Sequence, residues 1–274
     1  MSDLEAFRDF EAAGWNDGRA GPYHRVWGPM TIHAAEPLLD AAAVRKGRHV
    51  LDVACGPGYV AALAAARGAV VTGVDIAPQM IALARELHPM VEFEIGDAHE
   101  LPFGDEEFDG VVSNFVMPHL ADHARAVAEL ARVLRPGGAL ALTTWNREER
   151  NGHMKGLDEA VKAGGASAPS NAPAGPDPMI YADDDTFAAL LEGAGLAHVK
   201  VETVEWRQRI PDLDELWLGA REGGVRFAAF LASQDDAVLE RVRAELDRTM
   251  SGWKTADGYE FPMSAKLASG TKPR

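Results

Sequence analysis

The segment Val50–Gly58, VLDVACGPG, joins an apolar run to an acid and a glycine-rich turn. Its valines and leucine favour a buried strand. Gly56 and Gly58 allow a tight turn and leave no side chain between the backbone and a ligand. The alanine- and leucine-rich stretch 60–67 that follows favours a helix. Strand, glycine turn and helix N-terminus in this order are typical of the nucleotide-binding corner of a doubly wound sheet.

The glycine turn alone does not select a cofactor. Residues 56–61, GPGYVA, fit the pattern G-x-G-x-x-A, which serves NAD, FAD and S-adenosylmethionine alike. Asp75, at the expected end of the second strand, is placed to accept hydrogen bonds from the ribose hydroxyls of NAD or S-adenosylmethionine. Asp52 favours S-adenosylmethionine, because a carboxylate beside the turn repels a pyrophosphate and attracts an amino group and a sulfonium. Asp97, after the third expected strand, is placed to accept from an adenine amino group.

Four blocks of sequence resemble the class I S-adenosylmethionine-dependent methyltransferases, specifically the small-molecule branch that includes the ubiquinone/menaquinone C-methyltransferases. The blocks follow one another in unbroken order from Val50 to Trp145, and they are residues 50–58 (VLDVACGPG), 71–85 (VTGVDIAPQMIALAR), 96–120 (GDAHELPFGDEEFDGVVSNFVMPHL) and 131–145 (ARVLRPGGALALTTW). The resemblance implies an α/β fold with a doubly wound, mostly parallel, seven-stranded Rossmann-like sheet whose one antiparallel strand falls near 259–267. It also implies S-adenosylmethionine as cofactor and S-adenosylhomocysteine as product.

The resemblance assigns parts of the cofactor to parts of the sheet. The loop after the first strand is expected against the methionine part and the ribose, the ends of the second and third strands against the adenosine, and the end of the fourth beside the sulfonium. Two aromatic residues before the sheet are expected to close over the cofactor. Together with Asp52, the expected cofactor-binding residues are Tyr23, Trp27, Ala54, Cys55, Gly56, Gly58, Asp75, Ile76, Met80, Asp97, Ala98, Asn114 and Phe115.

Methyl transfer from a sulfonium is an in-line displacement, which mainly requires an acceptor atom about 3 to 3.5 Å from the methyl group. A base helps where the acceptor is a hydroxyl or an acidic carbon. His119, just beyond the fourth strand, is the first candidate for that catalytic base, although most loop histidines only make a backbone hydrogen bond. His24 and His33 are second candidates. His123 is expected in the first turn of a solvated helix.

Other side chains have a structural explanation beside the functional one. Cys55 fits better as a small loop residue than as a nucleophile, because no base is visible next to it. The acidic run Asp183–Asp185 is expected to cap a helix rather than bind a metal, and no metal site is predicted. Aromatic residues that either line an acceptor site or pack in the core are Trp145, Trp206, Trp217, Phe227 and Phe230.

Composition narrows the partners. The 274 residues include 42 acidic and 27 basic side chains and carry a formal net charge of −15, which argues against binding to nucleic acid or anionic membranes. The single cysteine excludes an internal disulfide, and the charged start lacks the apolar core of a signal peptide. We therefore expect a soluble cytoplasmic protein without membrane insertion, a monomer or homodimer that acts on a small-molecule acceptor.

Four regions are predicted along the chain. Residues 1–45 form an N-terminal helical segment, with helices at 3–13 and 32–43, that closes over the cofactor. Residues 46–150 form the cofactor-binding core, in which Pro136-Gly137-Gly138 ends a helix at 122–134. The Gly-, Ala-, Pro- and Ser-rich stretch within 151–182 is predicted as a flexible loop or lid. Residues 183–274 complete the sheet and carry a helical cap at 212–250, with helices at 213–220 and 237–250.

The sequence favours an S-adenosylmethionine-dependent methyltransferase that acts on O or C of a small, largely apolar acceptor. Two alternatives stay open. A methyltransferase-like enzyme could use the bound cofactor for a cyclisation or rearrangement without methylation. A nicotinamide-dependent oxidoreductase is allowed by the glycine turn and Asp75, but the chain lacks an evident Tyr-x-x-x-Lys pair.

Overall fold

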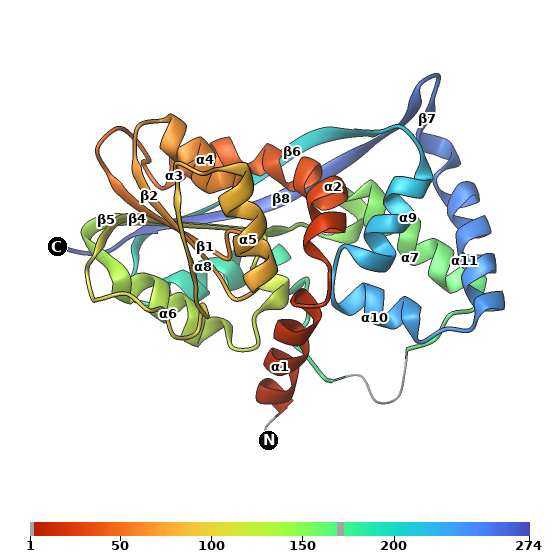
Figure 1. The fold of residues 1–274 in the computed structure, drawn as a ribbon, viewed down its shortest axis with the longest axis horizontal. Coiled ribbons are helices and arrows are strands. Elements are labelled where there is room, and N and C mark those ends of the chain that lie inside the picture. The colour runs from red at the N-terminus through yellow and green to blue at the C-terminus, as the bar shows by residue number, and fades with distance from the viewer. Residues whose placement is uncertain (1–2, 169–172) are drawn as a thin grey trace.

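The computed structural model describes residues 3–168 and 173–274. In Figure 1 the molecule has two parts. The sheet and the helices that cover it lie on the left, and a group of helices lies on the right. The first two helices, α1 (Asp3–Trp15) and α2 (Ala20–Thr31), lie between these two parts. The N-terminal segment is therefore in a position to contribute to any site at the boundary.

The central sheet has the strand order β3-β2-β1-β4-β5-β8-β6, and the two-residue strand β7 (Lys254–Thr255) pairs with β8. β8 (Gly258–Thr271) runs antiparallel to its neighbours on both sides. The remaining strands of the path are β1 (His49–Val53), β2 (Val70–Asp75), β3 (Glu92–Ile95), β4 (Phe108–Asn114), β5 (Leu134–Trp145) and β6 (Ala197–Ile210). The seven strands of this path, among which β8 is the antiparallel member, confirm the predicted doubly wound fold.

Alternate residues of the strands face opposite layers of helices. Val50 of β1 and Val112 of β4 pack in the cluster formed with α3, α4 and α5, whereas Leu51, Val53 and Val111 pack in the cluster formed with α6 and α8. These helices are α3 (Ala35–Ala41), α4 (Tyr59–Ala66), α5 (Pro78–Leu87), α6 (His123–Val133) and α8 (Asp184–Gly193). Both faces of the sheet are thus buried, as a mostly parallel sheet requires.

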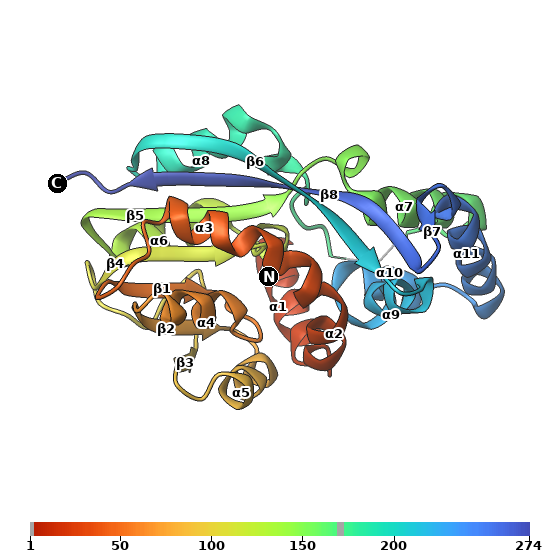
Figure 2. The same cartoon turned by 90° about the horizontal axis from the view of Figure 1, so that it is seen from above.

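The carboxyl ends of the parallel strands meet near the N-terminal helices. Figure 2 shows the arrowheads of β4 and β5 pointing toward α1 and α2. In an open α/β sheet, ligands bind outside the carboxyl ends of the strands, so this edge is the place to look for a site.

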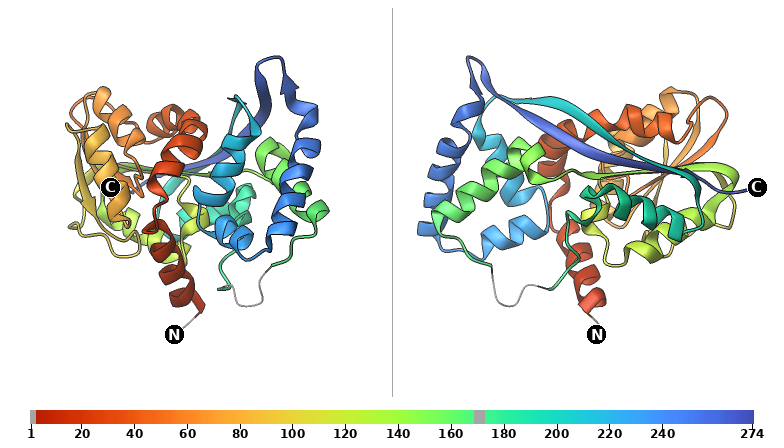
Figure 3. Two further views of the ribbon diagram at one scale, coloured as in Figure 1. Left: turned by 45° about the vertical axis from the view of Figure 1, so that its right-hand side comes forward. Right: turned by 180° about the vertical axis from the view of Figure 1, so that it is seen from behind.

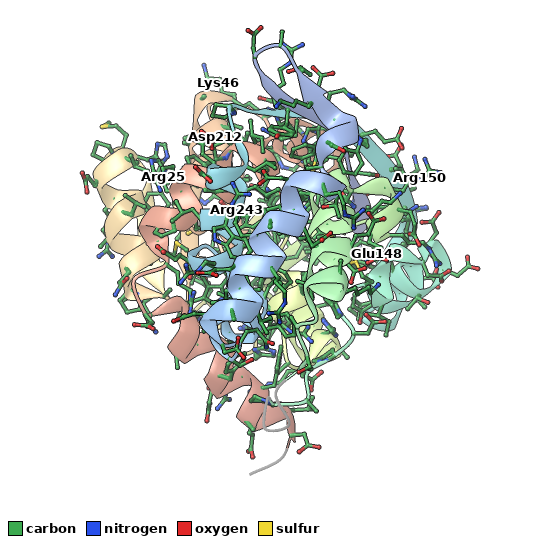
Figure 4. The ribbon with its side chains drawn as sticks, turned by 90° about the vertical axis from the view of Figure 1, so that its right-hand side faces the viewer. Arg25, Lys46, Glu148, Arg150, Asp212 and Arg243 are labelled. Carbon is green, nitrogen blue, oxygen red and sulfur yellow. The ribbon has the colours of Figure 1, made fainter. Side chains whose placement is uncertain are left out.

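A cap of helices is built on long extensions of β6 and β8, which run past the sheet toward β7 (Figure 3). Its helices are α7 (Gly152–Gly164), α9 (Leu213–Glu222), α10 (Arg226–Ala232) and α11 (Asp236–Thr249). In Figure 4 the cap is seen from the side of α11, which carries Arg243. Arg243 links two helices through ion pairs with Asp214 of α9, at 2.7 Å, and with Asp247 of its own helix, at 3.0 Å.

The predicted loop over 151–182 is wrong for its first half, because α7 occupies Gly152–Gly164. The glycines of α7 favour a loop in the sequence, but in the structure they permit close packing against α11. A Cβ at Gly164 would lie 2.5 Å from Cγ2 of Val242, and a Cβ at Gly156 would lie 2.2 Å from Sδ of Met250. Residues 169–172 of the predicted loop lie outside the described residues.

Two other boundaries differ from the prediction. Helix α2 was not expected, since its glycines and prolines disfavour helix, and the helix expected at 32–43 is a 3₁₀ turn at Ile32–Ala34 followed by α3. Strand β5 already begins at Leu134. Pro136-Gly137-Gly138 is part of it, because the Gly137 N–H donates to the Lys272 carbonyl and Gly138 O accepts from Lys272 N.

Candidate functional site

A cavity with about 790 Å³ of empty space, part of it open to solvent, lies at the carboxyl ends of β1, β2, β3 and β4. Residues from α1 and α2 form its other wall. Eleven of the fifteen predicted site residues line this cofactor cavity: Tyr23, Ala54, Gly56, Asp75, Ile76, Met80, Asp97, Ala98, Asn114, Phe115 and His119. Segments far apart in the sequence are thus brought to one place.

Asp75 joins the glycine loop to the end of β2. Its Oδ2 accepts the N–H of Gly56 at 2.9 Å, and its Oδ1 accepts the N–H of Ala77 at 2.9 Å. Burial raises the pKa of Asp75 above its ordinary value, and these backbone hydrogen bonds partly oppose that effect. Each carboxylate oxygen keeps a second lone pair, so Asp75 retains the capacity to accept from a ligand hydroxyl.

Asp52 does not line the cofactor cavity, which corrects its predicted contact with the cofactor. It is fully buried, and its Oδ2 accepts the N–H of Ala61 at 2.9 Å, in the first turn of α4. Its Oδ1 has no hydrogen-bond partner among the described residues. Burial raises the pKa of Asp52 to about 8. The Asp52 carboxyl group therefore stabilises the first turn of α4, the helix that follows the glycine loop.

Three more predicted contacts lie outside this cavity. Gly58 has a φ of +83° and precedes α4, and a Cβ there would lie 2.6 Å from Cζ of Phe93, so only glycine fits. Cys55 is buried beside Gly73 of β2, where burial raises the pKa of its thiol, in keeping with a packing role. Trp27 lines a different cavity.

The end of β4 is tied to α2 and β5. The Asn114 amide donates to the carbonyl of Thr31 at 3.2 Å, and its Oδ1 accepts from the hydroxyl of Thr143 at 2.6 Å. The Thr143 Oγ1 in turn accepts the N–H of Phe115 at 3.0 Å. Phe115 has a φ of +60°, a strained value for a bulky residue. The centroid of its ring lies 4.1 Å from the ring centroid of Trp145. These bonds hold Phe115 at the cavity wall.

Asp97 is paired with a residue that the sequence analysis did not single out. Its Oδ1 accepts from the backbone N–H of His99 at 2.8 Å and from the imidazole Nδ1 at 2.7 Å. Burial favours the neutral carboxyl, but the hydrogen bonds from His99 outweigh it and lower the pKa of Asp97 below its ordinary value. Asp97 is therefore a charged acceptor at the predicted adenine end of the cavity.

A second, larger cavity adjoins the first. It holds about 1610 Å³ of empty space, part of it open to solvent, and lies between α1, α2, the end of β5 and the cap helices α7, α9 and α10. Its apolar lining includes Trp27, Trp145, Leu157, Phe227 and Phe230. Among the described residues, four side chains line both cavities: Trp15, Tyr23, Phe115 and His119. We call this second space the cap cavity.

The predicted acceptor-site aromatics divide into two groups. Trp145, Phe227 and Phe230 line the cap cavity, which fits the first of the two interpretations left open for them, and they also pack against the core of the cap. Trp206 and Trp217 do not line it. Trp206 stacks on His33 with ring centroids 5.7 Å apart, and Trp217 packs in the core of the cap.

Buried His153 is a feature of the cap cavity that sequence reasoning missed. The centroid of its ring lies 5.5 Å from the ring centroid of Trp27 and 5.2 Å from that of Trp145. Its Nδ1 is 3.0 Å from the Sδ of Met263. Burial lowers the pKa of His153 to about 3, so the imidazole is neutral. The Gly-, Ala-, Pro- and Ser-rich composition of 151–182 predicts a loop, and a loop gives no reason to expect a buried histidine at position 153.

His119 has an acidic partner from the N-terminal helix. Its Nδ1 is 3.0 Å from Oε2 of Glu11, and Trp15 contacts it edge-on with ring centroids 5.1 Å apart. Glu11 and Trp15 also line the cofactor cavity, and sequence reasoning missed both. Their only sequence signal is an acid and an indole four residues apart, which share one face of a helix.

The other histidine candidates have structural partners. His24 is hydrogen-bonded to the hydroxyl of Tyr59 and stacks on its ring, outside both cavities, and His33 stacks on Trp206. His123 is not solvated as predicted, because its Nε2 hydrogen-bonds the carbonyl of Met117 at 2.9 Å and its ring lies edge-on against Tyr181.

The acidic run before α8 caps a helix as predicted. Oδ1 of Asp183 accepts the N–H of Thr186 at 3.0 Å. Within residues 3–168 and 173–274, no group of three His, Cys, Asp or Glu side chains could hold a metal ion.

Comparison with known protein families finds a match for the part of the chain that forms the cofactor cavity. A family described as "Methyltransferase domain" matches residues 51–142. The chain contains a methyltransferase domain. This methyltransferase domain spans the strands β1 to β5 and the glycine loop, the same elements that form the cofactor cavity.

Two curated relatives carry specific names. The chain is 36% identical over 197 residues to the 2-methyl-6-phytyl-1,4-hydroquinone methyltransferase of Synechocystis, covering 69% of this chain and 59% of the relative. It is 34% identical over 136 residues to the malonyl-[acyl-carrier protein] O-methyltransferase of Enterobacter lignolyticus, covering 50% of this chain and 54% of the relative. The matches thus span little more than half the length of these relatives.

Solved structures support the fold. The YcgJ protein of Bacillus subtilis superposes with a TM-score of 0.56 at 21% identity, covering 88% of this chain and 99% of that protein. Phosphoethanolamine N-methyltransferase 2 of Haemonchus contortus, in complex with S-adenosylhomocysteine, superposes with a TM-score of 0.55 at 19% identity, covering 98% of this chain and 60% of that protein. In the described part of the chain, no helix combines the length and apolarity needed to cross a membrane.

Proposed function

We propose that this protein transfers a methyl group from S-adenosylmethionine to an O or C atom of a small, largely apolar acceptor and releases S-adenosylhomocysteine. The observation that carries the proposal is the junction of the two cavities, where Trp15, Tyr23, Phe115 and His119 face both. A cofactor in one cavity and an acceptor in the other would meet at this junction. We further propose that the protein works in the cytoplasm as a monomer or homodimer.

The residues of the cofactor cavity fit S-adenosylmethionine. Asp75 has spare acceptor capacity for ribose hydroxyls, and Asp97 is a charged acceptor for an amino group. Ile76 and Met80 supply apolar surface for the adenine, and Gly56 leaves the backbone of the loop accessible. When bound, the cofactor supplies an electrophilic methyl group on a sulfonium.

Charge distinguishes this cofactor from a dinucleotide. Among the described residues, three carboxyl groups, on Glu11, Asp75 and Asp97, and one guanidinium, on Arg8, line the cavity, so acidic side chains outnumber the basic one. Acidic side chains attract the sulfonium and ammonium groups of S-adenosylmethionine and repel a pyrophosphate. This argument, together with the methyltransferase domain, favours S-adenosylmethionine over a nicotinamide cofactor.

The chain itself contributes mainly position and exclusion of water. The aromatic wall of the cap cavity would bind an apolar acceptor and keep water from the methyl group. Phe115, fixed through Thr143, gives the junction a rigid side. His119 is the candidate base, since it lies at the junction and an imidazole can take a proton from an acceptor hydroxyl or acidic carbon near neutral pH.

Isothermal titration calorimetry tests the proposal. The intact protein should bind S-adenosylmethionine and S-adenosylhomocysteine at one site and should show no heat with NADH. Binding of NADH, or of neither sulfur compound, would reject it. Once an acceptor is found, mass spectrometry separates methyl transfer, in which the product gains one methylene, from a cyclisation or rearrangement, in which it does not.

A further inference from the structure

Glu11 is an unusual residue on the N-terminal helix, because its side chain is only 4% exposed. It lines the cofactor cavity from α1. Its Oε2 lies 3.0 Å from Nδ1 of His119, whereas its Oε1 is buried and has no hydrogen-bond partner among the described residues. The carboxyl group is therefore half satisfied, on a side chain that lines the cofactor cavity.

The helix that carries Glu11 is held in place by its neighbours. Phe7, one turn earlier, is fully buried, and the guanidinium of Arg226 in the cap lies 5.2 Å from its ring centroid. Trp15, one turn later, contacts both His119 and Tyr23. These contacts fix the direction in which Glu11 points.

We propose that Glu11 has two roles: its Oε2 positions His119, and its Oε1 accepts a hydrogen bond from the bound cofactor. The inference rests on the proposed function, because it takes the ligand of this cavity to be S-adenosylmethionine or S-adenosylhomocysteine. Glu11 thereby makes the orientation of the candidate base depend on the same carboxylate that contacts the cofactor.

The first role follows from hydrogen-bond chemistry. An ionised carboxylate only accepts hydrogen bonds, so the Nδ1 of His119 must be the nitrogen that carries the proton. In the neutral imidazole the other nitrogen, Nε2, is then an unprotonated acceptor. His119 lines both cavities, so this tautomer provides a base at the junction.

The second role follows from burial. A buried acceptor without a donor is costly, and a charged one more so, which makes a ligand donor at Oε1 strongly favourable. The cofactor offers several donors, namely its ribose hydroxyls, its adenine amino group and its ammonium group.

The substitution Glu11→Gln tests both roles together. An amide has one acceptor oxygen, so it can serve His119 or the cofactor but not both, and its NH₂ group then faces a donor on the other side. The volume of the side chain is preserved. Glu5→Gln makes the same change at an exposed position of the same helix, outside the cavity, and is the matched control.

Two measurements give the readout. Titration with S-adenosylhomocysteine should show affinity reduced roughly 10- to 100-fold by Glu11→Gln and unchanged by Glu5→Gln. Nitrogen chemical shifts of His119 by NMR should show the Nδ1–H tautomer in the wild type and also in Glu11→Gln, because a Gln amide oxygen that accepts from Nδ1–H turns its NH₂ group toward the cofactor. Circular dichroism and thermal melting establish that the variant is folded, and a variant that is not folded is replaced by Glu11→Met.

The outcomes separate this inference from the proposed function. Failure of the wild type to bind S-adenosylhomocysteine would overturn both. Normal binding by the wild type with unchanged affinity in folded Glu11→Gln, or an Nε2–H tautomer of His119 in the wild type, would overturn the roles of Glu11 alone.

Discussion

The backbone N–H of Gly56 donates a 2.9 Å hydrogen bond to Oδ2 of Asp75, so the carboxylate that ends β2 holds the glycine loop that follows β1. The sequence presents these residues as two separate cofactor contacts. In the structure they are one unit, since the loop keeps its shape through the acid. A change at Asp75 is therefore expected to disturb both cofactor binding and the fold of the loop.

Asp75→Asn should weaken S-adenosylhomocysteine binding and lower the free energy of unfolding by about 1 to 3 kcal/mol. The amide has one acceptor oxygen, so either the Gly56 or the Ala77 N–H loses its partner. Calorimetric titration and urea unfolding measure the two effects. Glu94→Gln, at an exposed position of the neighbouring strand, is the control. Wild-type stability and affinity in Asp75→Asn would show that the loop does not depend on the acid.

Asp52 should make the protein less stable as the pH rises toward 8. Its folded pKa is about 8, well above its ordinary value of 3.8, so only the folded state holds the proton between these values. The stability from this group is fully present below about pH 4 and is lost as the pH rises through 8, by up to about 1.4 kcal/mol per pH unit. Urea unfolding from pH 4 to 8 should show a smaller loss in Asp52→Asn than in the wild type. The exposed-site variant Asp257→Asn should keep the wild-type dependence, and an identical dependence in Asp52→Asn would refute the assignment.

His153 should affect the pH dependence of stability in the opposite direction, so that the protein becomes less stable as the pH falls. Its folded pKa of about 3 lies below its ordinary value of 6.5, so the unfolded chain takes up a proton that the folded chain refuses. Stability is therefore lost as the pH falls from about 7 toward 3, by up to about 1.4 kcal/mol per pH unit. In His153→Gln this acid sensitivity should decrease, whatever the cost of the substitution at neutral pH. His49→Gln, at an exposed position, should leave the slope unchanged. An unaltered slope in His153→Gln would mean that the imidazole is not held neutral.

The close approach of α7 and α11 predicts that Gly164→Ala destabilises the cap. The added Cβ would lie 2.5 Å from Cγ2 and 2.8 Å from the backbone N of Val242, so one helix must shift, at a cost of about 1 to 3 kcal/mol. Gly193→Ala, in α8, meets no atom within 4 Å and should be neutral or stabilising by up to about 1 kcal/mol. Thermal unfolding of both variants measures the difference. Equal melting temperatures would show that α7 does not pack as described.

The core of the fold could be predicted from sequence because its signals are local. The apolar run 50–53 and the nearly continuous burial along β4 and β5 arise from strands covered on both faces. The alanine-rich stretch at 60–67 is helical on its own propensity. Helices α2 and α7 could not be predicted in the same way. Their glycines and prolines argue against helix, and only packing against distant elements, such as Gly164 against Val242, makes those residues favourable.

The residues of the cofactor cavity that lie at strand ends could be predicted from the sequence. Those that reach the cavity from other elements could not. Asp75, Asp97 and Phe115 end or follow strands, so the topology alone brings them to one edge. Glu11 reaches that edge from a helix more than 100 residues before its partner His119, and no local pattern announces the pairing. The prediction is wrong for Asp52, because its buried carboxyl group accepts the N–H of Ala61 and lies outside the cofactor cavity.

A crystal structure of the protein with S-adenosylhomocysteine tests the central claim most directly. The account predicts adenosine along the ends of β1, β2 and β3, between Asp75 and Asp97, with the sulfur facing Phe115 and His119 at the junction with the cap cavity. Electron density for the ligand at any other place, or a cofactor cavity that stays closed by side chains under saturating ligand, would contradict it.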